Sequence, residues 1–94
     1  MHTIQQYITE AELLLAIQYR AIKRLRIEET ENESYITHVL LTKEEDEKTL
    51  ITQRKHPREW ASLDRLIKHI RNNYGNVGTI TLTLSNSDSR QQTE

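Results

Sequence analysis

Apolar side chains recur at intervals of three and four positions between residues 11 and 25, a spacing that predicts an amphipathic helix. Thr9 and Glu12 are three residues apart, as in a capping box, where each side chain accepts a hydrogen bond from the backbone N–H of the other residue. We therefore predict that this helix begins immediately after Thr9. The preceding residues 3–8 fit either one more helical turn or a short extended segment.

Three segments in the middle of the chain have the composition of β-strands. Residues 25–28 alternate between apolar and charged side chains, and residues 35–42 are rich in β-branched residues and apolar on both faces. Burial of both faces is typical of a central strand. Residues 49–52 follow a charged turn at 43–47, so we expect 35–42 and 49–52 to pair as antiparallel strands.

A second helix is predicted in the C-terminal half of the chain. Pro57, the only proline, suits the first turn of a helix because its missing N–H needs no partner there. Gly75 stands where a helix often ends with a left-handed residue. Between them, an apolar stripe with helical spacing predicts the face that packs on the sheet: Trp60, Leu63, Ile67, Ile70 and Tyr74.

The last apolar segment, residues 79–84, alternates strictly between threonine and an aliphatic residue. This period of two predicts a strand with Ile80, Leu82 and Leu84 on one buried face. Residues 85–94 contain almost no apolar side chains, and we expect them to form a disordered polar tail.

Together these elements predict a single α+β domain over residues 1–84. Their order is α-β-β-β-α-β, and we expect a mostly antiparallel four-stranded sheet with both helices packed on it. The core must consist mainly of leucine and isoleucine, because aromatic residues make up only 5% of the 94 residues and phenylalanine is missing. A core of this size gives modest stability, so we also expect a homodimer that buries additional surface.

The chain carries 13 Lys and Arg against 14 Asp and Glu, a formal net charge of -1. Strong nucleic-acid binders are usually basic overall, so the total charge argues against that class. The absence of cysteine excludes disulfides and suits the cytoplasm. No apolar run approaches the length of a membrane-spanning helix, and the N-terminus lacks the pattern of a signal peptide. We therefore expect a soluble cytoplasmic protein without a membrane segment.

The order α-β-β-β-α-β is shared with restriction-endonuclease-like nucleases, which bind Mg²⁺ through an Asp on the second strand and a Glu-x-Lys on the third. The second predicted strand here has no acidic residue, and the position matching the third motif reads Gln53-Arg54-Lys55. Because Mg²⁺ requires carboxylate oxygens, this arrangement does not form the metal site. The shared order of elements remains a fold-level analogy, and we do not expect nuclease activity.

Other catalytic classes also lack their characteristic residues. His38, His56 and His69 are not accompanied by a Gly-x-Ser-x-Gly turn, and none of the four histidines has zinc-ligand spacing. We expect His38 to pair across the sheet, and His56 and His69 to lie on the surface. With two glycines in the chain, a glycine-rich phosphate-binding loop is excluded. The sequence thus predicts no catalytic residue, no metal site and no cofactor.

Basic residues concentrate where the third strand meets the second helix, and they continue along the solvent side of that helix. Such a surface is suited to contact phosphates, or an acidic protein surface, where Arg and Trp often contribute most of the binding energy. A third interpretation is that the tryptophan anchors the helix in the core and the basic residues are simply solvated. The candidate binding residues are Gln53, Arg54, Lys55, Arg58, Trp60, Arg65, Lys68 and Arg71.

Residues 52–66, which read TQRKHPREWASLDRL, and residues 80–84, which read ITLTL, resemble the small ParC-type partition-associated proteins of bacterial plasmids. That family is unrelated to the topoisomerase subunit of the same name. The resemblance covers most of residues 9–84 and implies a non-enzymatic accessory protein of a mobile genetic element. It implies partners as well, namely a partition ATPase and the DNA-binding protein that works with it.

Two other functions remain open from the residues themselves. Residues 54–71 are a candidate surface for direct binding of DNA or RNA. The acidic turns suit an inhibitor of host defence that mimics nucleic acid, although the near-neutral total charge disfavours this function.

Overall fold

The computed structural model describes residues 6–75 and 77–85 and confirms the α+β class. Its elements are β1 (Tyr7–Thr9), α1 (Glu10–Gln18), β2 (Ile22–Glu29), β3 (Tyr35–Leu41), β4 (Lys48–Ile51), α2 (Leu63–His69), the π-helical turn η1 (Ile70–Tyr74) and β5 (Thr79–Thr83). Compared with the predicted order, a short strand precedes the first helix. The predictions for residues 3–5 and for the tail at 86–94 lie outside the described residues.

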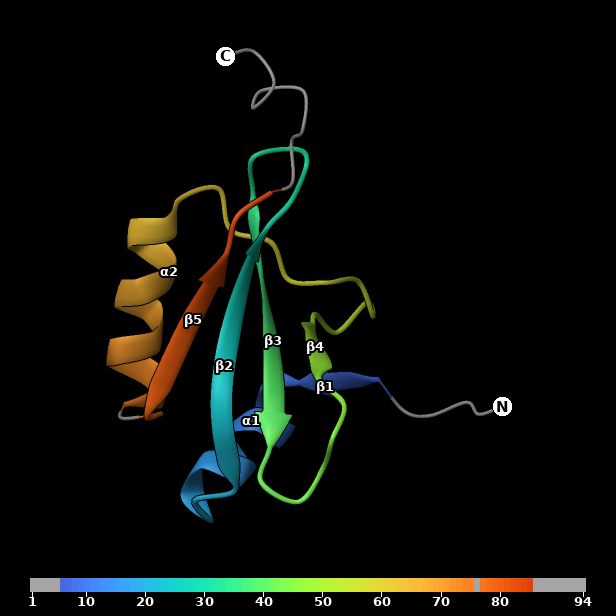
Figure 1. Cartoon of the computed structure of the whole chain (residues 1–94), viewed down its shortest axis with the longest axis vertical. Coiled ribbons are helices and arrows are strands. Elements are labelled where there is room, and N and C mark those ends of the chain that lie inside the picture. Colours follow the sequence, from blue (N-terminus) through green and yellow to red (C-terminus); the bar gives the residue numbers. More distant parts are fainter. Residues whose placement is uncertain (1–5, 76, 86–94) are drawn as a thin grey trace.

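The sheet has five strands in the order β1-β4-β3-β2-β5 (Figure 1). β3 runs antiparallel to both β2 and β4, whereas β1 is parallel to β4 and β5 is parallel to β2. The expected four-stranded, mostly antiparallel sheet is therefore wrong in strand number and in the share of parallel pairing. Its last strand is parallel because the chain leaves β4, crosses the sheet through α2 and re-enters in the same direction.

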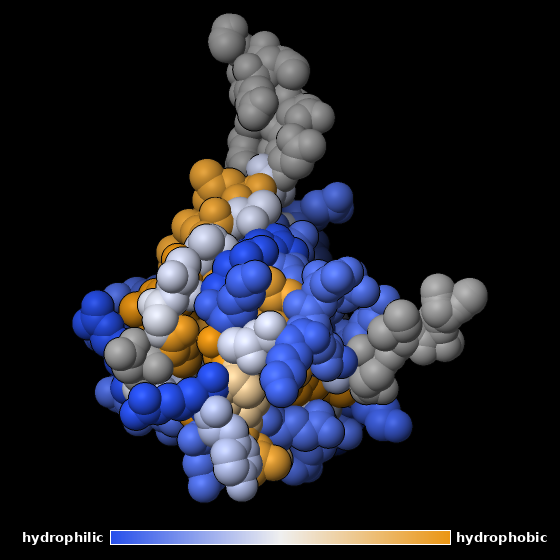
Figure 2. All heavy atoms as spheres, turned by 60° about the horizontal axis from the view of Figure 1, so that its bottom comes forward, coloured by the Kyte–Doolittle hydropathy of each residue, from blue (hydrophilic) through white to orange (hydrophobic). Residues whose placement is uncertain are grey.

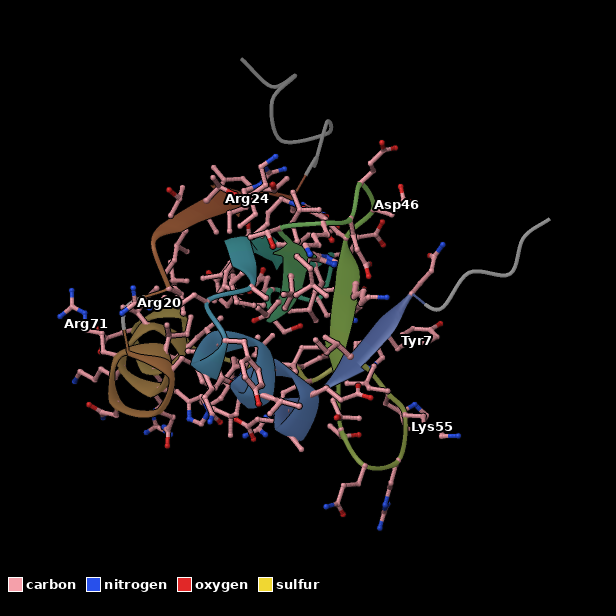
Figure 3. The ribbon with its side chains drawn as sticks, turned by 90° about the horizontal axis from the view of Figure 1, so that it is seen from below. Tyr7, Arg20, Arg24, Asp46, Lys55 and Arg71 are labelled. Carbon is pink, nitrogen blue, oxygen red and sulfur yellow. The ribbon has the colours of Figure 1, made fainter. Side chains whose placement is uncertain are left out.

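Both helices cover the same face of the sheet. Leu13 of α1 and Leu66 of α2 pack in one core with Leu25 of β2. In the end-on view of Figure 3, the two helices lie on one side of the sheet, and Arg24 and Asp46 lie on the other. The part of the chain that the structure describes thus has two layers, with one sheet face free of helices. Within the described residues, neither helix is long and apolar enough to cross a membrane.

The start of α1 is confirmed in detail. The Thr9 hydroxyl accepts a hydrogen bond from the Glu12 N–H at 3.2 Å, and the Glu12 carboxylate accepts one from the Thr9 N–H at 2.9 Å. The helix ends at Gln18, earlier than its apolar spacing predicts. Arg20 has a positive φ of 57°, which breaks the helix, and Leu25 belongs to the following strand, where it is fully buried.

The largest correction concerns residues 57–60, which are extended and do not begin a helix. The Arg58 N–H donates to the Leu50 carbonyl at 3.0 Å, while Trp60 and Tyr35 exchange two backbone hydrogen bonds of 2.9 and 2.8 Å. The direct β3–β4 ladder is short, with pairing between His38–Val39 and Lys48–Thr49 only. Residues 57–60 therefore bridge β3 and β4 where that ladder stops.

The second helix begins after Ser62, whose hydroxyl accepts a hydrogen bond from the Arg65 N–H at 3.2 Å. The apolar stripe is confirmed from Leu63 onward, since Ile70 and Tyr74 are buried and Leu63 and Ile67 pack, partly buried, against the core. Leu66 beside the stripe is buried as well. Gly75 ends this segment with a positive φ of 75°, but its ψ of -138° lies outside the left-handed helical region that we expected.

The expected burial of the last strand is wrong. Ile80, Leu82 and Leu84 are 37%, 45% and 66% exposed. Ile80 and Leu82 pair with the buried Leu25 and Ile27 and so point to the helix-covered face, yet β5 lies at the edge of the sheet. Alternation in the sequence identifies the apolar face, but it does not determine whether a helix covers that face.

The residue at which the second helix begins can be tested, because the two possible starts predict opposite effects of one substitution on stability. We expect Ser62→Ala to lower the free energy of unfolding by about 1 kcal/mol, because it removes the N-terminal cap. If the helix began at Pro57, Ser62 would lie inside it, and alanine would stabilise the protein. Urea unfolding followed by circular dichroism measures the difference. Ser62→Asp, which retains a capping oxygen, should remain close to the natural protein.

Candidate functional site

The exposed part of the predicted site is a tight turn over residues 52–56. The Thr52 N–H donates to the His56 carbonyl at 2.8 Å, and the Lys55 N–H donates to the Thr52 carbonyl at 2.8 Å. The Arg54 N–H donates to the Thr52 hydroxyl at 3.2 Å. These bonds fix the backbone and leave the side chains of Gln53, Arg54 and Lys55 in solvent.

The predicted site residues on the second helix lie elsewhere. Arg65, Lys68 and Arg71 are exposed on α2 and η1, and Lys68 is paired with Asp64 at 3.5 Å. Figure 3 shows Arg71 and Lys55 on opposite sides of the molecule. The fold therefore does not bring the eight candidate residues together as one basic surface.

A cleft of about 560 Å³ lies between the turn and the start of α1. Three of its lining residues belong to the predicted binding residues: Gln53, Arg54 and Arg58. The opposite wall comes from Thr9, Glu10 and Ala11, which the sequence did not mark as functional. The cleft thus combines two arginines with one carboxylate.

Glu10 is the centre of a polar cluster behind this cleft. Its Oε2 accepts hydrogen bonds from His69 Nε2 at 3.0 Å and from the Tyr74 hydroxyl at 2.7 Å. The guanidinium of Arg58 lies 3.9 Å from its Oε1. One carboxylate therefore connects the first turn of α1 with residues 57–60, with the end of α2 and with η1.

The pKa values of this cluster follow from its contacts. Burial by itself raises the pKa of the Glu10 carboxyl, but the hydrogen bonds from His69 and Tyr74 and the charge of Arg58 outweigh it and bring the pKa below its usual range. Burial raises the pKa of the Tyr74 phenol above its usual range, and Glu10 raises it further. At neutral pH, Glu10 is therefore a carboxylate and Tyr74 is a protonated donor.

Aromatic contacts complete the cluster. The rings of Trp60 and His69 have centroids 4.9 Å apart, and the ring of Tyr74 meets the imidazole edge-on at 5.3 Å. The Arg58 guanidinium lies 5.0 Å from the centre of the Trp60 ring, in cation–π contact. Arg58 and His69 are thus partly buried, and the expectation that they point to solvent is wrong.

Both nitrogens of His69 are engaged. Nε2 donates to Glu10, and Nδ1 lies 3.1 Å from the Asn73 amide nitrogen, which also donates to the His69 carbonyl at 3.0 Å. This pattern fits the Nε2–H tautomer with Nδ1 as acceptor. The imidazole therefore has no unoccupied nitrogen with which to accept a proton from a substrate.

A second polar network lies on the open face of the sheet. Arg26 binds the Glu47 carboxylate through three contacts of 2.9 to 3.1 Å, and it reaches the Thr83 hydroxyl at 3.0 Å. The hydrogen bond from Arg26 lowers the pKa of Glu47 below its usual range. The predicted cross-strand pairing of His38 is confirmed. Its Nε2 lies 2.7 Å from Glu28 Oε1, and its Nδ1 lies 3.1 Å from the Thr49 hydroxyl.

Residues 6–75 and 77–85 contain no group of three or more His, Cys, Asp or Glu side chains arranged to hold a metal ion. Comparison with protein-family models, with curated proteins and with solved structures finds no match to this chain.

The Glu10 cluster predicts a specific pH dependence of stability. The pKa of the Glu10 carboxyl is lower in the folded state than the ordinary 4.5. The stability that its ionised form contributes is therefore complete above about pH 4.5, and it is lost as the pH falls through the pKa of the folded state. Glu10→Gln should therefore be less stable than the natural protein at neutral pH. The difference in free energy of unfolding should shrink below pH 4.5, as urea titrations at several pH values would measure.

Glu45→Gln is the matched control, because Glu45 is exposed and has no hydrogen bond or ion pair within the described part of the chain. A constant difference between Glu10→Gln and the natural protein at all pH values would contradict the assignment of Glu10 as the charged centre of the cluster.

Proposed function

We propose that the protein is a non-catalytic binding protein whose cleft beside Arg54 and Arg58 receives an acidic segment of a protein partner. The observation that carries this proposal is the grouping of both arginines and Gln53 around one cleft of about 560 Å³. Guanidinium groups bind carboxylates through two parallel hydrogen bonds, so this lining suits Asp and Glu side chains.

The charges around the cleft favour an acidic ligand despite the presence of Glu10. That carboxylate already accepts hydrogen bonds from His69 and Tyr74 and lies beside Arg58. Arg54 is exposed and has no ion pair within the described residues, so its positive charge is available to a ligand. Among the charged residues that line the cleft, Glu10 and Arg58 already lie beside each other, so Arg54 is the one to which a partner's carboxylate would bind.

The backbone around the cleft is already ordered for binding. Hydrogen bonds within the turn hold residues 52–56, and the bond from the Arg58 N–H to the Leu50 carbonyl fixes the start of residues 57–60. A partner that docks here does not have to order this backbone first, which reduces the entropic cost of association.

Several features support a binding role in preference to catalysis. The His69 ring nitrogens are both occupied by Glu10 and Asn73. Tyr74 is 5% exposed, and its hydroxyl donates to Glu10. The cluster therefore fits a structural role, in which it supports the wall of the cleft and holds Arg58 between Glu10 and the Trp60 ring.

The proposed partner follows from the resemblance of residues 52–66 to ParC-type partition-associated proteins. That segment contains the turn, Arg58, Trp60 and the start of α2, so it forms one side of the cleft. We accordingly propose that the partner is a partition ATPase or the DNA-binding protein that works with it, and that the protein serves plasmid maintenance as an accessory component.

Direct binding of nucleic acid is a second candidate function, favoured by one observation. Arg54, Lys55, Arg65 and Arg71 are exposed and have no ion pairs with other described residues. Contacts of such side chains with phosphates would give an affinity that falls steeply with salt concentration. A mobility-shift titration with duplex and single-stranded DNA at low and physiological salt tests this function, and the absence of a shift at low salt would exclude it.

Charge reversal at the cleft tests the protein partner. We expect Arg54→Glu to weaken binding by at least about tenfold, because it replaces an attractive charge with a repulsive one at the mouth of the cleft. Arg71→Glu makes the same charge change on the other side of the molecule and should leave the affinity nearly unchanged. Calorimetric titration with a partition ATPase and with its DNA-binding partner measures the difference.

Equal weakening by the two variants would contradict a role for the cleft and would instead indicate a general effect of net charge. Failure of the natural protein to bind either partition protein would remove the proposed partner.

A further inference from the structure

The outer edge of β5 combines two features that sheet edges in soluble proteins usually avoid. Its Ile80 and Leu82 side chains are exposed, and within residues 6–75 and 77–85 the strand has one paired neighbour, β2. Figure 2 shows the hydrophobic surface that runs along β5 at the upper left of the molecule. A strand with one neighbour leaves alternate backbone N–H and C=O groups pointing outward, where they are available to another strand.

The sequence around β5 has none of the usual protection against edge pairing. Natural edge strands are commonly interrupted by lysine, other charges or proline. Residues 72–87 contain no charged residue and no proline, in a chain that is 29% charged. The opposite edge of the sheet, β1, is only three residues long. An uncharged stretch of this length therefore coincides with the longer of the two outermost strands of the described sheet.

The order of side chains in β5 is symmetric about Thr81. If two copies pair antiparallel with Thr81 opposite Thr81, then Ile80 of each copy lies opposite Leu82 of the other. Thr79 then lies opposite Thr83. Every pair in this register is therefore apolar with apolar or threonine with threonine, and both kinds of cross-strand pair are favourable.

The orientation of the two copies also suits the apolar side chains. The two-fold axis of such a pair is perpendicular to the sheet, so the helix-covered faces of both copies lie on the same side. Ile80 and Leu82 point to that face, because their β2 partners are the buried Leu25 and Ile27. Four exposed aliphatic side chains, two from each copy, would then form one continuous apolar cluster.

We propose that β5 pairs antiparallel with β5 of a second copy of this chain, with Thr81 on the two-fold axis, so that two five-stranded sheets become one. The symmetry of the strand argues for a second copy as the occupant, because each residue finds its own chemical counterpart in the same register. This interface is independent of the cleft, which lies at the other end of the sheet, next to β1 and β4.

Cysteine cross-linking tests the register directly, because the chain contains no cysteine. Residues directly opposite in an antiparallel pair have Cα atoms about 4.5–5.5 Å apart, within the range that a disulfide spans. Thr81→Cys should therefore form a disulfide-linked dimer on mild oxidation. Thr79→Cys is the matched control. Its two cysteines would be about four residues apart along the paired strands, roughly 14 Å, and should remain unlinked.

A charge at the edge tests the interface without a cross-link. Light scattering coupled to size-exclusion chromatography should give the natural full-length chain the mass of a dimer, and Leu82→Lys should halve that mass. Leu15→Lys is the control, because Leu15 is a similarly exposed leucine, 53% against 45%, on α1. Leu15→Lys should remain dimeric. Circular dichroism and thermal unfolding verify that each variant is folded.

Several results would overturn the proposal. One is that the natural chain is monomeric at every concentration. Another is that Thr79→Cys cross-links as efficiently as Thr81→Cys. A third is that Leu15→Lys breaks the dimer whereas Leu82→Lys does not. The last result would place the interface on α1. Arg54→Glu should leave the dimer intact, so failure of the cleft proposal and failure of the dimer proposal give different results.

Discussion

The arrangement of the molecule depends on the insertion of residues 57–60 where the direct β3–β4 ladder stops. Backbone hydrogen bonds from Arg58 to Leu50 and between Trp60 and Tyr35 satisfy groups that would otherwise lack partners at the ends of these strands. They also determine where the chain is free to become helical. Because Trp60 is fixed beside β3, α2 begins at the next available cap, Ser62. Arg58 consequently reaches Glu10 at the start of α1, and Trp60 packs against His69, instead of both projecting from a helix.

Glu10 then joins the two helical parts of the fold. It lies in the first turn of α1, where the helix dipole favours a negative charge, and it accepts hydrogen bonds from His69 and Tyr74 at the far end of the second helical segment. An acidic group that is partly buried is tolerated when donors replace the water it loses. The interaction network is thus a structural support, and its outer member, Arg58, forms part of the cleft wall.

Short-range signals in the sequence predicted the local structure well. The Thr9–Glu12 capping box needs only neighbouring residues, and the β-branched run of β3 is apolar on both faces, so both could be read directly. The start of α2 could not, because Pro57 is compatible with an extended strand as well as with a helix, and only a partner strand decides between them. Glu10 was missed for a similar reason: its partners His69 and Tyr74 are about sixty residues away, and no local pattern connects them.

The positions of the two candidate surfaces have a consequence for binding. The cleft lies beside β1 and β4, whereas β5 forms the opposite edge of the same sheet. Pairing through β5 would therefore leave both clefts open, one at each end of a continuous sheet. A dimer of this kind presents two equivalent sites in a fixed geometry, and a partner that is itself repeated or oligomeric would gain affinity from simultaneous contact without any new contact at either site. Modest affinity at a single small cleft is then sufficient for a stable assembly, provided that the spacing of the partner's acidic segments matches that of the two clefts.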